Sequence, residues 1–190
     1  MPTDGDELSR KDLPPGSALR IVDPHLPSVT VELPSSGSRE ARSPETPQRS
    51  VALHHLRQVW LQLRGDWTWL AVVPGEPDLS TADFAHALSQ VGAGLSAEMV
   101  GFVEASDVDL ESGSWLIDRL GNPPGDPARS PARTLVSLAN PISNPFALPV
   151  TKAADGVILC VRRGRTPLPS IRETIEAVGP DHVVCSVLVG

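Results

Sequence analysis

Several kinds of residue are scarce in this 190-residue sequence, and each shortage excludes something. There is no tyrosine, so phosphorylation of the chain on its own tyrosines is excluded. The 16 lysines and arginines are outnumbered by 23 acids, and the net charge of −7 argues against binding to nucleic acid or acidic lipid headgroups, which need a basic field. No apolar run approaches the roughly 18 residues of a membrane span, and the first residues lack the features of a signal peptide. We therefore expect a cytoplasmic protein that does not itself insert into a membrane.

Cysteine and histidine give no sign of a metal site. Cys160 and Cys185 are the only cysteines, and both lie in apolar runs, where a thiol behaves as a small hydrophobic group. We therefore expect both cysteines to be buried in the core. His54 and His55 are adjacent, so their side chains diverge on a helix, and no cysteine or acidic cluster accompanies them. No metal ligand is predicted.

Proline, in contrast, is abundant at the start of the chain: 8 of the 20 prolines precede Ser50. Residues 1–49 are rich in Pro, Ser, Gly and charge and show little periodicity, so they cannot bury enough apolar surface to fold alone. The sequence predicts a disordered arm over residues 1–49 and one folded domain over residues 50–190. Within the arm, residues 28–33 alternate like a short strand that docks on a sheet edge or on a partner.

Helical and strand-like patterns alternate through the folded domain. Apolar runs ended by turn residues predict strands at 68–73, 99–104, 134–139, 156–161 and 183–189. Helical periodicity predicts helices at 51–64, at 110–120, from Ser80 or Thr81 to the glycines at 92 and 94, and at 170–178 with a Ser170/Glu173 capping box. This order predicts an α/β fold, a doubly wound and mainly parallel sheet of about five strands with flanking helices.

Ligands of such a sheet bind at the carboxyl ends of its strands, so the turn after the first strand is the candidate site. Its residues are Gly75, Glu76, Pro77, Asp78, Leu79, Ser80 and Thr81. Together with Pro74, this turn resembles the Walker A region of the bacterial tyrosine kinases of capsule and exopolysaccharide systems. In that branch of the deviant-Walker P-loop ATPases, Pro-Gly-Glu-Gly-Lys-Ser-Thr is typical. The sequence departs from it at Pro77-Asp78-Leu79, which replaces Gly-Lys with one residue inserted.

This departure affects the chemistry that a P-loop performs. Such a loop points backbone N–H groups at the phosphates, neutralises them with a lysine and coordinates magnesium through a hydroxyl. Here the lysine is missing and Pro77 has no N–H. Asp78 adds a negative charge whose repulsion of a phosphate a few ångströms away costs roughly 1–4 kcal/mol. We therefore expect no nucleotide cofactor; ATP and magnesium would bind only if this argument from degeneracy is wrong.

The resemblance extends over most of the folded domain. Residues 154–166 closely follow the family's Ala-Asp-Gly-Val-x-Leu-Val-Val-Arg-x-Gly-x-Thr, which is a scaffold element. The helix from residue 51 resembles the family's self-association helix, although only Arg57 keeps a charge and His54 replaces the first arginine. The second acidic motif falls on residues 101–106, where Glu104 and Ser106 replace its aspartates. The third motif, at 136–141, contains no acid at all.

Scaffold elements are therefore kept while the residues that contact nucleotide are replaced. The resemblance implies a non-catalytic pseudo-kinase or pseudo-ATPase, a regulatory or scaffold protein of cell-envelope polysaccharide biosynthesis or export. Its partner would be a protein, such as a membrane component of an export or polymerisation system, which would hold the chain at the periphery of the inner membrane. The oligomeric state is left open.

Two alternatives remain, and one further feature bears on binding. The chain could be another deviant-Walker positioning or partitioning regulator, or a weak divergent enzyme that uses Asp78, Glu104 or Asp155. The tryptophans could mark a recognition surface, but we expect them to pack in or beside the core: Trp60, Trp67, Trp69 and Trp115.

Overall fold

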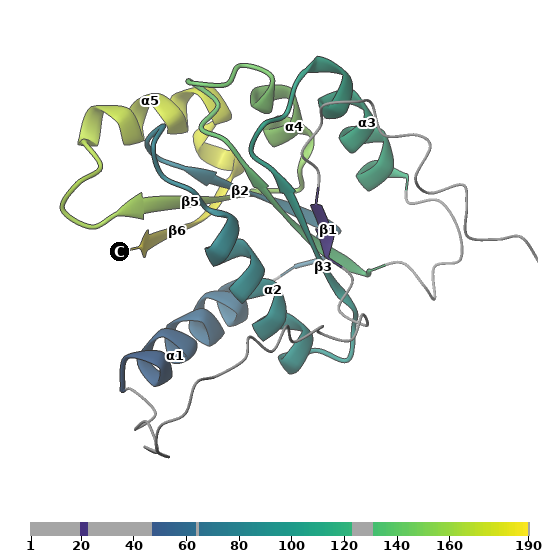
Figure 1. Cartoon of the computed structure of the whole chain (residues 1–190), viewed down its shortest axis with the longest axis vertical. Coiled ribbons are helices and arrows are strands. Elements are labelled where there is room, and N and C mark those ends of the chain that lie inside the picture. The colour runs from purple at the N-terminus through teal and green to yellow at the C-terminus, as the bar shows by residue number, and fades with distance from the viewer. Residues whose placement is uncertain (1–19, 23–46, 64, 123–130, 190) are drawn as a thin grey trace, which may run out of the picture.

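The computed structural model describes residues 20–22, 47–63, 65–122 and 131–189. It forms an α/β fold with one six-stranded sheet in the order β1-β3-β4-β2-β5-β6 (Figure 1). Five strands are parallel, and each lies within one residue of its predicted bounds: β2 (Trp69–Pro74), β3 (Val100–Ala105), β4 (Arg133–Leu138), β5 (Val157–Arg162) and β6 (Val183–Val189). The predicted fold class is therefore confirmed.

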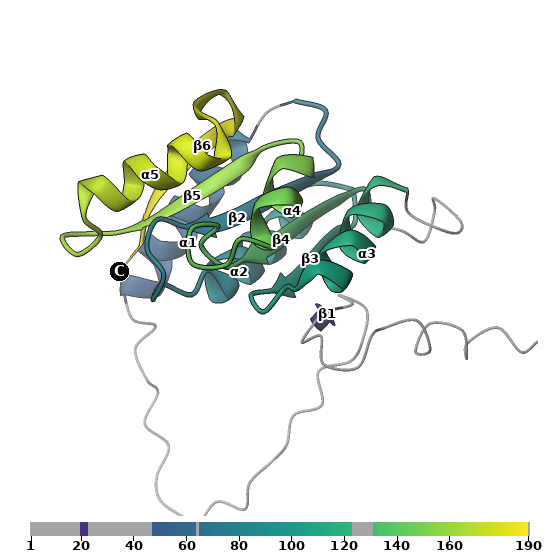
Figure 2. The ribbon, with the colours of Figure 1, turned by 90° about the horizontal axis from the view of Figure 1, so that it is seen from above.

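Helices cover both faces of the sheet, as Figure 2 shows from above. On one face lie α1 (Pro47–Gln62) and α2 (Ala82–Leu95), and on the other lie α3 (Leu110–Gly121), α4 (Ala147–Ala153) and α5 (Leu168–Val178). A short 3-10 turn (Pro180–His182) leads from α5 into β6. No helix in the described ranges is long and apolar enough to cross a lipid bilayer.

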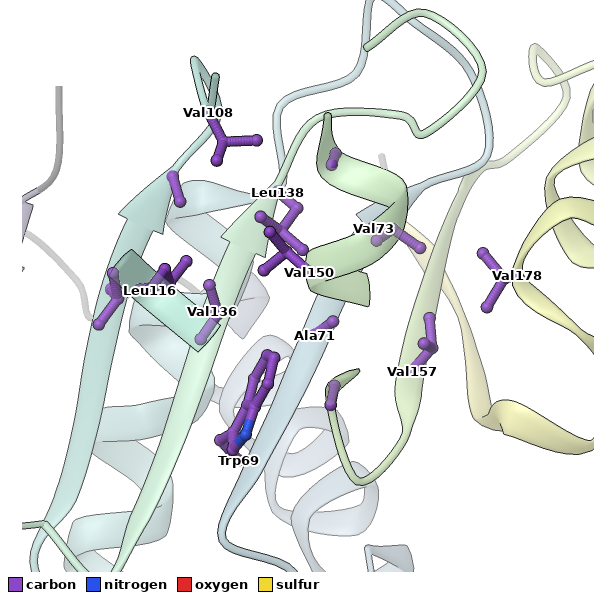
Figure 3. Close-up of a cluster of buried hydrophobic side chains, with 14 of the residues drawn as sticks. Trp69, Ala71, Val73, Val108, Leu116, Val136, Leu138, Val150, Val157 and Val178 are labelled. Atoms are coloured by element: carbon purple, nitrogen blue, oxygen red, sulfur yellow. The ribbon is translucent and has the colours of Figure 1, made fainter. Parts of the chain in front are cut away.

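The central strand β2 explains why the sheet needs both helical layers. All six of its residues are buried, and they alternate between the two faces. Leu70 and Val72 pack with side chains of α1 and α2, whereas Trp69, Ala71 and Val73 pack with Leu116 of α3, Val150 of α4 and Val178 of α5 (Figure 3). A strand buried on both faces has no polar side, which is why it appears in the sequence as a continuous apolar run.

The cysteines and tryptophans are mostly where the sequence places them. Cys160 is fully buried, and burial raises its pKa to about 12, with the nearby Cys185 thiol adding to the rise. Cys185 is only partly buried, because it lies on the edge strand β6, and burial raises its pKa as well. Trp60, Trp67 and Trp69 are buried and Trp115 packs against the core, as predicted.

Several boundaries differ from the predictions. The expected capping box of Ser170 and Glu173 is wrong: α5 begins at Leu168 after Pro167, and no side chain caps it. Helix α4 is absent from the predictions because its seven residues are too few for a periodic pattern and include Pro149. Gly92 and Gly94 do not end α2, which continues to Leu95.

The N-terminal segment contributes two described pieces. Arg20–Val22, inside the predicted disordered arm, form the short strand β1, which pairs antiparallel with β3. Helix α1 begins at Pro47, slightly before the predicted start of the domain. The strand-like residues 28–33 lie outside the described residues.

Gly92, inside α2, leaves space for a tryptophan side chain of α1. A Cβ atom on Gly92 would overlap the indole ring of Trp60, a buried residue of α1, whereas one on Gly94 would meet nothing within 4 Å. The close approach of α1 and α2 therefore depends on the missing side chain at Gly92.

We predict opposite effects for alanine at these two glycines. Gly92→Ala should lower the free energy of unfolding by roughly 1–3 kcal/mol, because the indole must move within a packed core. Gly94→Ala, the matched control, should be neutral or stabilising by up to about 1 kcal/mol through helix propensity. Denaturant unfolding followed by tryptophan fluorescence measures both; equal stabilisation by the two variants would contradict the packing account.

Candidate functional site

The loop after β2 lies where the winding direction of the sheet reverses. From β2 the chain passes through α2 to β3, towards the β1 edge of the sheet. From the neighbouring strand β5 it passes through α5 to β6, which forms the opposite edge. Adjacent strands whose connections diverge in this way leave a crevice outside their carboxyl ends, the usual ligand position of doubly wound sheets. The loop of residues 75–81 follows β2 and the turn of residues 163–167 follows β5, so both lie at this position (Figure 1).

Arg162, the last residue of β5, contacts the loop of residues 75–81 and so links it to β5. Its Nε atom lies 3.4 Å from Oε1 of Glu76, and its terminal nitrogen donates a hydrogen bond of 3.3 Å to the carbonyl of Asp78. The Glu76 side chain is only 14% exposed, and its Oε1 is buried and accepts no hydrogen bond from any described residue. The guanidinium charge therefore compensates an acid of the loop itself.

Thr81, the last residue of the loop, is turned into the protein. Its hydroxyl donates a 3.1 Å hydrogen bond to the carbonyl of Val72 and shares a 2.8 Å hydrogen bond with the hydroxyl of Ser137 on β4. Only 2% of Thr81 is exposed. It stands at the start of α2 as expected, but its hydroxyl does not cap the helix. The Thr81 hydroxyl is thus committed to internal bonds. Ser80, which stands where the resemblance would place the magnesium-binding hydroxyl, is exposed.

Asn140 makes a similar internal link at the end of β4. Its amide nitrogen donates to the carbonyl of Pro74 at 2.8 Å and to the Thr174 hydroxyl at 3.1 Å. Its amide oxygen accepts from the backbone N–H groups of Ile142 and Ser143 at 2.9 and 3.3 Å. Asn140 thus joins the ends of β4 and β2 to α5. This role is not among the predictions from the sequence, although a polar residue so close to the end of a buried strand is a usable signal.

The acids considered for a weak enzyme do not meet. Asp155 precedes β5 and accepts hydrogen bonds of 2.6 and 3.0 Å from the N–H groups of Thr68 and Trp69, at the amino end of β2. Asp78 lies beyond the carboxyl end of that same strand, and Glu104 lies on β3, in register with Ser137. Asp155 and Asp78 are therefore separated by the length of the sheet. Ser106 follows β3 and is partly exposed.

The remaining candidates lie on α1, away from this crevice. His54 and Arg57 are exposed, and Arg57 lines a groove of about 280 Å³ between α1 and α2 with mostly apolar neighbours. The other lining residues are Leu53, Leu56, Ala87, Gln90, Val91, Gly94 and Leu95. Among the described residues, no three His, Cys, Asp or Glu side chains gather in a way that could hold a metal ion.

Comparison of the chain with known proteins identifies no relative. No protein-family model matches the chain, and searches of curated proteins and of solved structures find no significant match.

The ion pair of Arg162 with Glu76 should contribute measurably to stability. We predict that Arg162→Met lowers the free energy of unfolding by roughly 1–3 kcal/mol, because it leaves a buried carboxylate oxygen without a cation and a carbonyl without its donor. Adding Glu76→Gln should recover part of this loss, since it removes the uncompensated charge. Arg163→Met, at the exposed neighbouring position, is the matched control and should change stability by less than about 0.5 kcal/mol. Equal effects of the two arginine variants in urea unfolding would contradict this account.

Proposed function

We propose that this chain is a non-catalytic pseudo-kinase or pseudo-ATPase that acts as a regulatory or scaffold protein in cell-envelope polysaccharide biosynthesis or export. The observation that carries the proposal is the loop of residues 75–81, at the crevice where a P-loop would hold phosphate. Its Glu76 is paired with Arg162, and its Thr81 hydroxyl is buried against Ser137. Asp78 contributes a further negative charge to the loop. A phosphate arriving there would meet two acids and a cation that is already engaged.

The surroundings of the loop favour a protein partner. Large apolar side chains are exposed in segments that follow the carboxyl ends of three parallel strands: Leu110 after β3, Ile142 and Phe146 after β4, and Leu168 after β5. Because these strands are parallel, all four residues follow strand ends at the same end of the sheet, and exposed apolar side chains that form a patch are typical of interaction surfaces. We call these four residues the carboxyl-edge residues. A fold by itself does not prove a function, so the proposal depends on this edge and on the altered loop.

The enzyme alternative receives less support. Asp78 and Asp155 lie beyond opposite ends of β2, so they cannot act on one bound substrate, and the Asp155 carboxylate is used to hold the start of β2. A different deviant-Walker regulator would share the same altered loop and remains the second candidate. It differs from the first in its partner rather than in its chemistry.

We predict that the protein does not bind ATP with magnesium at millimolar or better affinity. Isothermal titration calorimetry with ATP, with and without magnesium, should show no saturable heat. Asp78→Lys returns a cation to the loop and should increase any residual binding, whereas Asp181→Lys, the same charge change on an exposed residue between α5 and β6, should not. Magnesium-dependent binding by the unaltered protein would overturn the pseudo-enzyme proposal.

Binding to a protein partner is predicted to depend on the carboxyl-edge residues. When the chain is co-expressed with the membrane component of a polysaccharide-export or polymerase system, the two should co-purify. Phe146→Ser with Leu168→Ser should abolish this, because both apolar side chains are about half exposed or more and available for contact. Leu95→Ser, exposed at the end of α2, is the control and should leave co-purification unchanged. If Leu95→Ser abolished co-purification while Phe146→Ser with Leu168→Ser did not, the partner would bind at a surface other than the carboxyl-edge residues.

A further inference from the structure

Helices α1 and α2 lie side by side on one face of the sheet (Figure 1), and an apolar groove of about 280 Å³ runs between them. All of the residues that line the groove belong to these two helices. Two of its leucines remain exposed to solvent: 42% of Leu53 on α1 and 47% of Leu95 on α2. Gly94 has no side chain, and a Cβ atom there would meet nothing within 4 Å. The groove is therefore open to side chains of another molecule.

One cation lies in this apolar surface. Among the described residues that line the groove, Arg57 alone is charged, and its side chain is exposed. Leu53, Arg57 and Leu61 are spaced four residues apart on α1, so they are neighbours along one side of the helix. Leu61 is 63% exposed. The surface of α1 therefore presents an arginine between two exposed leucines.

Neither helix contributes an acid to the groove. The sequence of α1 contains no aspartate or glutamate, and α2 contains only Asp83, in its first turn and before the residues that line the groove. Glu98, which follows α2, is already paired with Arg133 at 3.2 Å. Arg57 itself forms no ion pair with a described residue. In a chain of net charge −7, this cation is therefore available to an acid that a partner supplies.

We propose that the groove binds an amphipathic helix of another protein, whose apolar side chains contact Leu53, Leu61 and Leu95 and whose carboxylate pairs with Arg57. A helix that lies in a hydrophobic groove presents apolar residues at positions i, i+3, i+4 and i+7. An aspartate or glutamate between two such residues faces the arginine between the two leucines of α1. Such a charge-assisted hydrogen bond is stronger than one between neutral groups, and the surrounding apolar side chains shield it from water.

The groove suits a protein segment better than a small molecule or a membrane surface. Pockets that enclose a drug-sized ligand have volumes of roughly 300–1,000 Å³ and several convergent polar groups. This groove is smaller, and among its described lining residues only Arg57 and Gln90 have polar side chains. An acidic membrane is a poor occupant because a single arginine attracts its headgroups weakly, and the chain as a whole carries a net charge of −7.

This groove is separate from the carboxyl-edge residues, and the inference does not depend on the function proposed above. Gly94 and Leu95 lie shortly before the amino end of β3, whereas the carboxyl-edge residues follow the carboxyl ends of strands. The two surfaces therefore lie toward opposite ends of the sheet, and one chain can hold two partners. Leu95→Ser should accordingly weaken binding in the groove while it leaves co-purification through the carboxyl-edge residues unchanged.

Peptide selection on the full chain tests the inference. Phage-displayed random peptides of about 16 residues, long enough for roughly four helical turns, are selected on the immobilised unaltered chain, with excess Gly94→Phe chain in solution as competitor. The added phenyl ring occupies open space in the groove, so this competitor removes peptides that bind elsewhere. The selected peptides should carry apolar residues at helical spacing with an aspartate or glutamate between them. Because so small an interface binds weakly, their dissociation constants should be about 1–100 μM by fluorescence polarisation.

Charge variants measure the contribution of the arginine. Arg57→Glu should raise the dissociation constant of a selected peptide at least about tenfold, because two carboxylates would then face each other. Arg119→Glu, the same charge reversal at an exposed position of α3, is the matched control and should leave binding unchanged. Both arginines are exposed, so neither variant should disturb the fold. If Gly94→Phe fails to fold, Arg57→Glu replaces it as the competitor.

Several results would overturn the inference. One is a selection in which no peptide distinguishes the unaltered chain from the competitor, and another is a set of peptides that are basic or insensitive to Arg57→Glu. Sedimentation equilibrium that shows the unaltered chain to dimerise, and Arg57→Glu to prevent it, would make a second copy the occupant. Binding of the chain to phosphatidylserine vesicles that Arg57→Glu abolishes would assign this face to a membrane surface instead.

Discussion

The burial of β2 on both faces and along both edges is the constraint on which the other features depend. The strand pairs with β4 on one side and β5 on the other, so its backbone polar groups are satisfied without water. Each end is also fixed: Asp155 accepts hydrogen bonds from the N–H groups of Thr68 and Trp69, and the N–H of Gly75 donates to the carbonyl of Cys160 at 2.8 Å. The loop of residues 75–81 thus leaves the core at a defined place, in a defined direction.

At that place the polar groups of the crevice are used inside the protein. Arg162 engages Glu76 and the carbonyl of Asp78, Thr81 engages Ser137, and Asn140 joins β4 to β2 and α5. A group that already has an internal partner must give it up before it can bind a ligand, and each such exchange gains little net free energy. The same bonds hold the ends of three strands together. These contacts therefore fix the loop of residues 75–81 relative to the ends of β4 and β5.

The strands could be predicted from the sequence because burial on both faces produces apolar runs, which is a local property. The site could not, because its contacts join distant segments. Arg162 lies more than eighty residues after Glu76, and only the placement of β5 beside β2 brings them together. The same is true of Asn140, whose bond partners Pro74 and Thr174 lie on two other elements. At Gly92 a local rule gave the wrong boundary, since glycine weakens a helix in isolation but here provides space for Trp60.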